Sequence, residues 1–334
     1  MSSPMLTVRD LEVTFTVDGD ELKVLDGVSF SVAPRQTLGL VGESGCGKSV
    51  TALAIMGLLP RPHGRVVAGT IDFEGEDLLA LPPEQMHRVR GNRISMIFQE
   101  PMTALNPVQT VGEQLMEVFR LHRPEYDKAQ RKAAAIAMLQ KVGIPEPAQR
   151  FAVYPHNLSG GMRQRVMIAM ALSCEPDLLI CDEPTTALDV TIQAQILELM
   201  KELQAQTGMA IIFITHDLGV VAELCDEVVV MYAGRAVEQA DVYTLFASPH
   251  HPYTHGLLGA IPRLDGQPKQ LLNTIRGQVP ALHEMQAGCR FANRCPHASE
   301  RCNREVPAVE LLAPHHGVAP HHGVACHHWK ELIP

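Results

Sequence analysis

The chain has 334 residues, of which 46% are hydrophobic, and it carries a formal net charge of −9 at pH 7. This length allows one large core and a smaller appended module, while the acidic balance argues against a diffuse basic face for nucleic acid. The sequence shows neither an export signal nor an apolar run of about 18 residues, the length that spans a bilayer. We therefore expect a soluble, cytoplasmic protein.

The N-terminal part predicts a small layer of antiparallel strands that leads into a phosphate-binding context. Apolar and polar residues alternate over 6–15 and 24–32, a period typical of half-buried strands. The apolar run 37–41 enters a Gly-rich segment, and 49–58 continues at helical spacing up to Pro60. Strand, loop and helix in this order form the context that a phosphate loop requires.

The Gly-rich segment, residues 42–49 (GESGCGKS), fits the pattern G-x-x-x-x-G-K-[ST], whose glycines let backbone N–H groups converge on phosphate oxygens. Lys48 would neutralise the β- and γ-phosphates, and Ser49 would offer its hydroxyl to Mg²⁺ at a helix start that faces the anion. Phe15, at a strand end, would stack on adenine, although a core position explains it equally well. The expected contacts from the loop are Ser44, Gly45, Cys46, Gly47, Lys48, Ser49 and Val50.

The middle of the chain predicts a helical insertion in a parallel α/β core. From 99 to 158 the pattern is helical and more polar, notably over 112–121 and 128–142, so we expect a helical subdomain at about residues 100–163. Beyond it, the short apolar runs 178–181 and 210–215 predict buried strands, with a helix over 191–206 between them. This alternation is typical of a parallel sheet.

Two carboxylates follow the strand predicted at 178–181. Asp182 would hold the Mg²⁺ shell, and Glu183 would orient the attacking water or accept a proton from it. Gln99, after the apolar run 94–98, would reach the metal or the water, and His216 would bond the γ-phosphate. Each of these residues alone is more often structural, so their order after a phosphate loop carries the assignment.

The segment 158–162 (LSGGM) predicts an anion site at a helix start. The Ser159 hydroxyl can cap the helix that follows Gly161, so hydroxyl, glycine N–H groups and the positive helix end converge. One chain cannot easily fold this segment onto its own Lys48. We therefore expect the phosphate to come from a second subunit.

In this order the motifs resemble the ATP-binding subunits of ABC transporters over roughly residues 5–260. In that family 42–49 looks like Walker A, Gln99 the Q-loop, 158–162 the signature, 178–183 Walker B, 187–189 the D-loop and His216 the switch histidine. One departure is Met162, where many members carry Gln. The resemblance implies an ATP sandwich between two subunits, with contacts from Ser159, Gly160, Gly161, Asp182 and Asp189.

Segments 153–165, 182–189, 231–234 and 251–254 further resemble the ATPases of oligopeptide and dipeptide importers, of the type with a cysteine-bearing C-terminal extension. This resemblance implies an ATPase domain over 1–260, an extension over 261–334, and a place at the cytoplasmic face of the inner membrane. The implied partners are a second ATPase, identical or a paralogue, two membrane permeases and an external peptide-binding protein.

Three other functions remain open at this stage. Related systems import nickel or another solute, because the permeases and the binding protein choose the cargo. A soluble ABC ATPase that acts on DNA or ribosomes typically has two cassettes, a coiled-coil insertion or basic extensions, and the sequence shows none of these. A tail-centred metal sensor that uses ATP only for assembly would not need Glu183.

Four of the eight cysteines, Cys289, Cys295, Cys302 and Cys326, lie near the C-terminus, and the other four are scattered singly. Without an export signal, a metal or cluster is favoured over disulfides. The four are separated by five, six and 23 residues, not by the short pairs typical of zinc, so we expect a four-iron, four-sulfur (4Fe-4S) cluster, with Zn²⁺ as the alternative. The resemblance associates this pattern with an iron–sulfur cluster, and thiols that bind nothing remain a further alternative.

The C-terminal histidines could form a metal-sensing tract, but we expect them to be mostly exposed tail residues that bind Ni²⁺ or Zn²⁺ adventitiously. They are His315, His316, His321, His322, His327 and His328.

Overall fold

The computed structural model describes residues 3–99, 104–186, 189–261, 274–312 and 322–332. The chain forms two compact units, one with residues 1–3, 33–36 and 80–213 and the other with 4–32, 37–79 and 214–334. Each unit thus collects segments that are distant in the sequence. The domain boundary predicted between residues 260 and 261 falls inside the second unit, and it stays a prediction.

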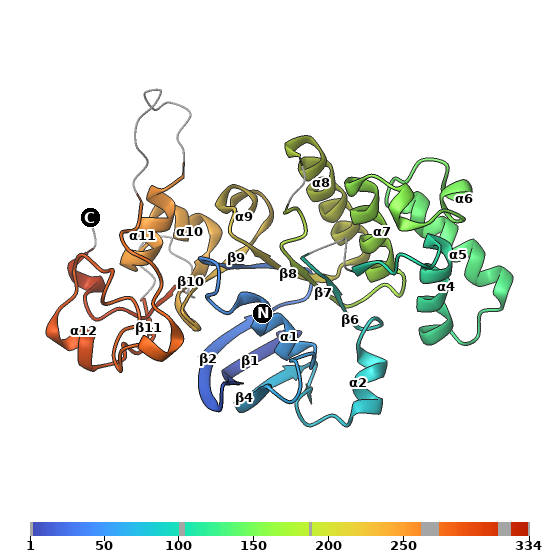
Figure 1. Cartoon of the computed structure of the whole chain (residues 1–334). Helices are drawn as coiled ribbons and strands as arrows, with labels where there is room; N and C mark the ends of the chain where they lie inside the picture. Colours follow the sequence, from blue (N-terminus) through green and yellow to red (C-terminus); the bar gives the residue numbers. More distant parts are fainter. Residues whose placement is uncertain (1–2, 100–103, 187–188, 262–273, 313–321, 333–334) are drawn as a thin grey trace. The chain divides into compact units, whose positions relative to one another are not determined.

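The antiparallel layer predicted for the N-terminal part is confirmed in the second unit (Figure 1). It has the strand order β2-β1-β4-β5, with β1 (Leu6–Val17), β2 (Asp20–Val32), β4 (Gly64–Phe73) and β5 (Glu76–Asp77). Asp18 and Gly19 alone join β1 to β2, with φ angles of 52° and 94°. Two positive φ angles make the type I′ turn, which favours Asp-Gly and matches the twist of paired strands.

A further set of strands in the second unit has the order β11-β12-β10-β9-β3. β3 (Thr37–Val41) is parallel to β9 (Glu227–Tyr232), and β10 (Arg235–Asp241) is antiparallel to β9. On the other side of β10 lie β12 (Gly323–Val324) and β11 (Glu310–Leu311), both antiparallel to their neighbours. The C-terminal segment therefore adds strands to the sheet whose β3 leads into the Gly-rich loop.

The described helices of the second unit are short, and the first of them follows that loop. They are α1 (Lys48–Ile55), α9 (Leu218–Leu224), α10 (Val242–Ala247), α11 (Pro252–Gly259) and α12 (Glu300–Arg304), with 3-10 turns at Leu282–Glu284 and Trp329–Glu331. The helix predicted over 49–58 ends earlier, at Ile55, because Gly57 adopts a φ of 60° that stops the helix.

The first unit contains the buried strands β6 (Ile94–Ile97), β7 (Leu178–Asp182) and β8 (Ala210–Thr215), in the order β8-β7-β6. The first four residues of β8 belong to this unit. β6 is parallel to β7, and every residue of the three strands is buried. Continuous apolar runs of this kind are typical of parallel strands covered on both faces, so the predicted buried strands are confirmed.

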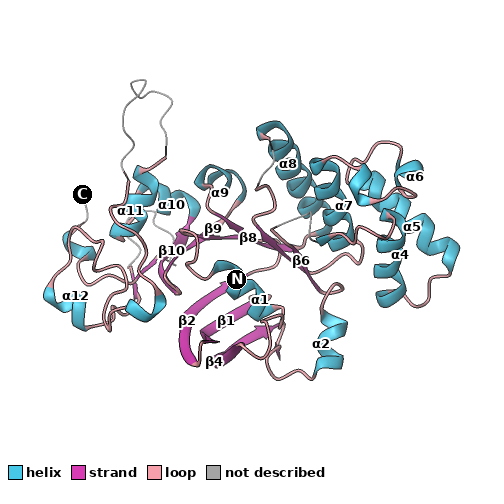
Figure 2. Ribbon diagram, viewed as in Figure 1, coloured by secondary structure: helices cyan, strands magenta, loops and turns pink. Residues whose placement is uncertain are grey.

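Among the described residues between β6 and β7, Figure 2 shows helices and loops only. The helices of this unit are α2 (Pro83–Val89), α4 (Val111–His122), α5 (Lys128–Lys141), α6 (Pro147–Arg150), a 3-10 turn at Pro155–Asn157, α7 (Gly160–Leu172) and α8 (Val190–Thr207). Reciprocal capping boxes start α4, at Thr110 and Glu113, and α5, at Asp127 and Gln130. The helices predicted over 112–121, 128–142 and 191–206 are thereby confirmed as α4, α5 and α8.

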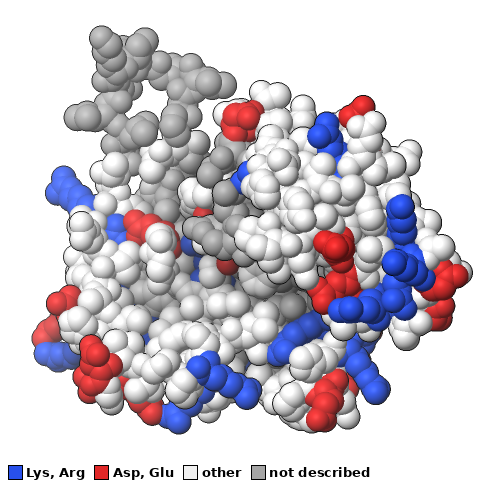
Figure 3. Space-filling view, turned by 45° about the vertical axis from the view of Figure 1, so that its right-hand side comes forward, with Lys and Arg blue, Asp and Glu red and all other residues white. Residues whose placement is uncertain are grey.

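The described surface carries both signs of charge, and Figure 3 shows Lys and Arg interspersed with Asp and Glu on the face in view. In the part of the chain that the structure describes, no helix is long and apolar enough to cross a bilayer.

Candidate active site

The Gly-rich loop between β3 and α1 has a backbone that needs glycine at two points. Gly42 has a φ of 149°, and a Cβ there would lie 2.2 Å from the carbonyl oxygen of Met231. Gly47, with a φ of 103°, is the N-cap of α1, and no side chain caps that helix. The first N–H groups of α1 are therefore not capped by a side chain and can bind an anion.

Lys48 is buried within this loop. Its Nζ donates to the carbonyl oxygens of Gly42, at 2.8 Å, and Glu43, at 3.2 Å, and approaches Cys46 Sγ at 3.6 Å. Burial raises the pKa of the Cys46 thiol, although Lys48 opposes the shift, so Cys46 is a packed neutral residue. Ser44 and Gly45 are exposed at the tip of the loop, whereas Ser49 and Val50 are half-buried in the first turn of α1.

The carboxylates predicted at the end of β7 take two different environments in the first unit. Asp182 is buried as the last residue of the strand, and Glu183 follows with a φ of 47°. A non-glycine residue seldom adopts this left-handed conformation. Glu183 Oε2 accepts hydrogen bonds from Gln99 Nε2, at 3.1 Å, and Thr186 Oγ1, at 2.9 Å. The structure therefore brings together two of the predicted catalytic side chains, Gln99 and Glu183.

The signature segment caps α7 as predicted. Ser159 is the N-cap, and its hydroxyl accepts from the N–H of Met162 at 3.3 Å. A Cβ on Gly160 would meet nothing within 4 Å, whereas a Cβ on Gly161 would lie 2.9 Å from a methyl group of Ile192 on α8. Gly160 is thus open on the surface, and Gly161 is needed for close packing.

Two further contacts tie α7 and α8 to the segment that follows β7. The buried Gln164 of α7 donates its side-chain N–H to the carbonyl oxygen of Pro184. Asp189 is the N-cap of α8 and accepts from the N–H of Ile192 at 2.9 Å. Of the predicted D-loop, Ala187 and Leu188 lie outside the described residues.

Phe15 and His216 belong to the second unit. Phe15 is half-buried, and its ring lies 3.1 Å from the point where a Cβ on Gly64 would be, so it packs over β4. His216 is exposed just after β8. The nucleotide contacts of both residues stay predictions.

The four C-terminal cysteines lie in what we call the cysteine segment, residues 289–312 and 322–328. Burial, followed by the neighbouring thiols of Cys295, Cys289 and Cys302 among the smaller causes, raises the pKa of Cys326 to about 11. Ser299 links two of the cysteines, because its Oγ lies 3.5 Å from Cys302 Sγ and 2.8 Å from the ring Nε2 of His328. The backbone N–H of His328 in turn donates to Cys326 Sγ.

A tetrahedral zinc site, with Zn–S bonds of about 2.3 Å, holds its sulfurs about 3.8 Å apart. Among the described residues, the one group of three or more His, Cys, Asp or Glu side chains with ligand atoms within 4.8 Å of one another is Glu238, His250 and His322. The four thiols are a suitable donor set for zinc or a cluster, but their spacing is wider than one zinc ion takes. The cluster therefore stays a prediction.

The group of Glu238, His250 and His322 corrects one expectation, because His322 is buried, with a 1% exposed side chain. The Glu238 carboxylate accepts from His322 Nε2 at 2.8 Å and from the backbone N–H groups of His250 and His251 at 2.6 and 3.0 Å. It is thus a buried carboxylate whose hydrogen bonds are satisfied, and we assign it to structure. His327 and His328 are half-buried, and His315, His316 and His321 lie outside the described residues.

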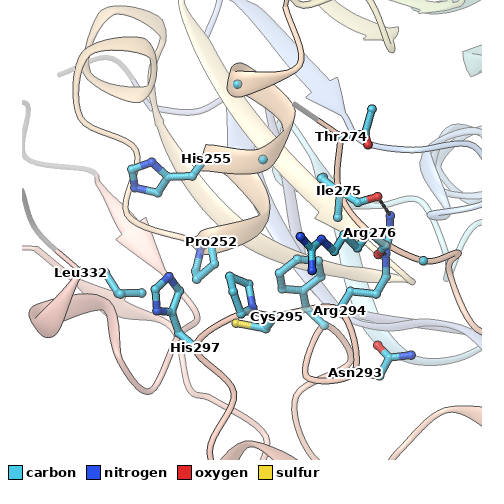
Figure 4. A pocket seen from close by; sticks show the side chains of 15 residues that line it. Pro252, His255, Thr274, Ile275, Arg276, Asn293, Arg294, Cys295, His297 and Leu332 are labelled. Atoms are coloured by element: carbon cyan, nitrogen blue, oxygen red, sulfur yellow. Dashed lines mark hydrogen bonds between the residues drawn. The ribbon is translucent and has the colours of Figure 1, made fainter. Parts of the chain in front are cut away.

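An open cavity of about 940 Å³ adjoins the cysteine segment. Figure 4 shows Cys295 among the side chains that line it, between His297 and Arg294. None of the described lining residues is acidic. Sequence reasoning missed Arg294 and its neighbour Arg290; the signal that could have revealed them is their place directly beside cysteines in the string CRFANRC, 289–295.

The comparisons with known proteins agree over nearly the whole chain. The family described as "ABC transporter" matches residues 25–186, and the one described as "Oligopeptide/dipeptide transporter, C-terminal region" matches 237–302. The dipeptide transport ATP-binding protein DppD of Bacillus subtilis is 52% identical over 94% of this chain and 93% of its own. DppD of Escherichia coli is 50% identical over 92% of this chain and 94% of its own.

Among solved structures, the dimeric structure of MJ0796, a bacterial ABC transporter cassette, covers 71% of this chain and 99% of its own, with a TM-score of 0.64 and 25% identity. The order of the loop, carboxylate and signature motifs, the α/β fold and these relatives lead to one assignment. The chain belongs to the ATP-binding subunits of ABC transporters of the peptide and dipeptide type, a family of ATPases.

Proposed function

We propose that the chain hydrolyses ATP between two ATPase subunits and thereby drives uptake of dipeptides or oligopeptides through partner permeases. The observation that carries the catalytic part is the hydrogen bond of Gln99 to Glu183 directly after β7. An amide and a carboxylate side by side can hold and deprotonate a water molecule, which supports the proposal.

In this mechanism the water oxygen bonds to the γ-phosphorus, the bond from that phosphorus to the β–γ bridging oxygen breaks, and ADP leaves. Glu183 accepts the proton of the water, and Gln99 orients Glu183. Lys48 neutralises the charge that develops on the phosphate oxygens, and His216 donates a hydrogen bond to the γ-phosphate.

Ser49, Asp182 and Gln99 are the residues that would hold Mg²⁺, since hydroxyl, carboxylate and amide oxygens are the ligands it prefers. Bound there, the ion would neutralise part of the negative charge of the β- and γ-phosphates.

The second half of the ATP site would come from a partner subunit. Ser159 and Gly160 are exposed at the start of α7, and Asp189 is exposed at the start of α8, so all three are available to another chain. The similarity to a cassette solved as a dimer supports this arrangement. The partner is either a second copy of this chain or a paralogue, and we propose a paralogue.

Glu183→Gln tests the catalytic assignment. We expect ATP binding to be retained and hydrolysis to fall by at least about 100-fold, because an amide cannot accept the proton. Glu198→Gln, at an exposed position of α8, is the control and should hydrolyse ATP at the normal rate. Rapid turnover by Glu183→Gln would remove Glu183 from the mechanism.

The transport assignment places the chain at the cytoplasmic face of the inner membrane, bound to two permeases that receive cargo from an external peptide-binding protein. The peptide and dipeptide names of the relatives support this cargo. Reconstitution of the whole transporter in vesicles should show ATP hydrolysis stimulated by peptide-loaded binding protein. Stimulation by a nickel chelate instead would support the alternative cargo, and activity of the isolated chain on DNA or ribosomes would favour a non-transport ATPase.

For the cysteine segment we propose a 4Fe-4S cluster on Cys289, Cys295, Cys302 and Cys326, with Zn²⁺ as the alternative. The influence of the other three thiols on the pKa of Cys326 and the Ser299–His328 bridge support a common ligand. Anaerobically purified protein should contain about four iron and four sulfide per chain, and Cys295→Ser should lose them while Cys174→Ser, at a buried cysteine of the first unit, should not. Stoichiometric zinc without sulfide would overturn the cluster.

A further inference from the structure

The cysteine segment contacts the Gly-rich loop, residues 42–49, through an arginine, and from here on we call this loop the nucleotide loop. Arg294, next to Cys295, forms two bonds with Glu43, the second residue of the loop: Nη1 binds Oε2, and Nη2 binds Oε1 at 3.0 Å. These residues are 251 positions apart in the sequence. Paired N–H···O bonds of this kind fix the carboxylate in orientation as well as in distance.

Glu43 is held at each of its polar groups. Its N–H donates to the hydroxyl of Tyr253 at 2.8 Å, its carbonyl accepts from Lys48 Nζ at 3.2 Å, and its carboxylate is bound by Arg294. The same residue therefore connects α11, the phosphate-binding lysine and the cysteine segment. A shift of Glu43 would move a carbonyl group that positions the Lys48 ammonium.

Arg294 is itself rigidly placed. Its side chain is 3% exposed, its Nε donates to the carbonyl of Arg276 at 3.0 Å, and its guanidinium lies 5.7 Å from the centre of the Tyr232 ring. Tyr232 also packs against Phe291, with ring centres 5.1 Å apart. Because water hardly reaches the guanidinium, Arg294 depends on Glu43 and these neighbours to satisfy its charge and its N–H groups.

Arg290, next to Cys289, makes a second connection to the base of the loop. Its guanidinium binds the carbonyl of Ala233 and, at 2.8 Å, the carboxylate of Asp26. Gly234, which follows Ala233 in the chain, donates its N–H to the carbonyl oxygen of Cys46 in the loop at 2.8 Å. The cysteine segment thus supports the nucleotide loop from both ends of the string 289–295.

We propose that Arg294, assisted by Arg290, is a positioning residue for ATP, and that the affinity of the nucleotide loop depends on an intact cysteine segment. The loop provides the N–H groups that bind the phosphates. A displacement of Glu43 and Lys48 by a fraction of an ångström would therefore weaken all the hydrogen bonds to the phosphates together. This inference requires the nucleotide site of the proposed function, but it does not require that the four cysteines hold a cluster.

The test is calorimetric titration of the full chain with MgADP, which reports on the loop without a partner subunit. Arg294→Ala should bind MgADP at least about fivefold more weakly, and Arg294→Lys should remain weakened because an ammonium cannot make two parallel bonds. Arg301→Ala, which removes an exposed arginine of the same segment that pairs with Glu305, is the matched control and should bind normally.

Glu43→Gln tests the same contact from the other side, and the double variant Glu43→Gln/Arg294→Ala should bind no more weakly than the weaker single variant. Melting temperature and iron content are measured on each variant. If Arg294→Ala melts earlier or loses iron but keeps its MgADP affinity, the arginine is structural only and the inference fails. If Arg294→Ala does not fold, normal affinity in Glu43→Gln would overturn the inference in the same way.

Discussion

The nucleotide loop and the cysteine segment lie in one compact unit but are held by different interactions. β3, which leads into the loop, is entirely buried, with Leu38 and Leu40 fully enclosed. The described part of the cysteine segment has short regular elements, such as the five residues of α12 and the two of β12. Besides the packing of Phe291 on Tyr232, its attachment uses the polar side chains Arg290, Arg294 and Glu238. Apolar packing tolerates changes of pH and charge, whereas an attachment by a few buried polar groups depends on each of them.

The largest effect is expected on the loop side of this comparison. Gly42→Ala places a Cβ against the Met231 carbonyl, 2.2 Å away, at a φ of 149°, and should cost more than about 3 kcal/mol of unfolding free energy. Gly19→Ala, at a φ of 94° with nothing within 4 Å, should cost only about 1 kcal/mol. Urea unfolding measures the free energy lost in both variants. Equal losses would show that the cost comes from the positive φ angle and not from the contact with Met231.

Acid should weaken the polar attachment first. Burial lowers the pKa of His251 from 6.5 to about 4, so between these values the unfolded chain binds a proton that the folded chain does not. Stability should therefore fall as pH drops from about 6.5 to 4, by about 3 kcal/mol.

The pKa of Glu238 is lowered as well, because hydrogen bonds from His322 and the backbone outweigh the opposing effect of burial. A carboxyl with a lowered pKa stabilises the fold above its unfolded value of 4.5 and loses that effect as pH falls through its folded value. Protonation of either group thus lowers the stability of the fold as the pH falls, and the effect of His251 begins at the higher pH. Unfolding midpoints from pH 7 to 4 measure the slope, which His251→Asn should reduce and His283→Asn, at an exposed histidine, should leave unchanged.

The smallest effect is expected at exposed ion pairs of the cysteine segment. Arg304 pairs with Glu300 one turn away on α12, and both side chains are more than 70% exposed, at 73% and 77%. Such pairs gain little in water, so Arg304→Ala should move the melting temperature by less than about 1 °C. A larger shift would mean that surface charges, and not the buried arginines, hold the segment.

The sequence predicted the features that depend on neighbouring residues, and it missed those that depend on contacts between distant ones. The antiparallel layer, the buried strands β7 and β8 and the helices α4, α5 and α8 were predicted from local periodicity and apolar runs, because these signals lie within a few neighbouring positions. The burial of His322 was not predictable in this way, since its partner Glu238 is 84 residues away. The same holds for Arg294 and Glu43, whereas Gln99 and Glu183 were predicted because each follows an apolar run in a chain that carries a phosphate loop.

The pairing of β12 with β10 has a consequence for the behaviour of the protein at high concentration. Without β12 and β11, the N–H and C=O groups along the outer side of β10 would be open to pairing with a strand of another molecule, which is a common start of aggregation. β11, with only two residues, leaves a much shorter edge at the end of the sheet. The C-terminal segment therefore also covers part of an edge that would otherwise be open to such pairing, whatever its cysteines bind.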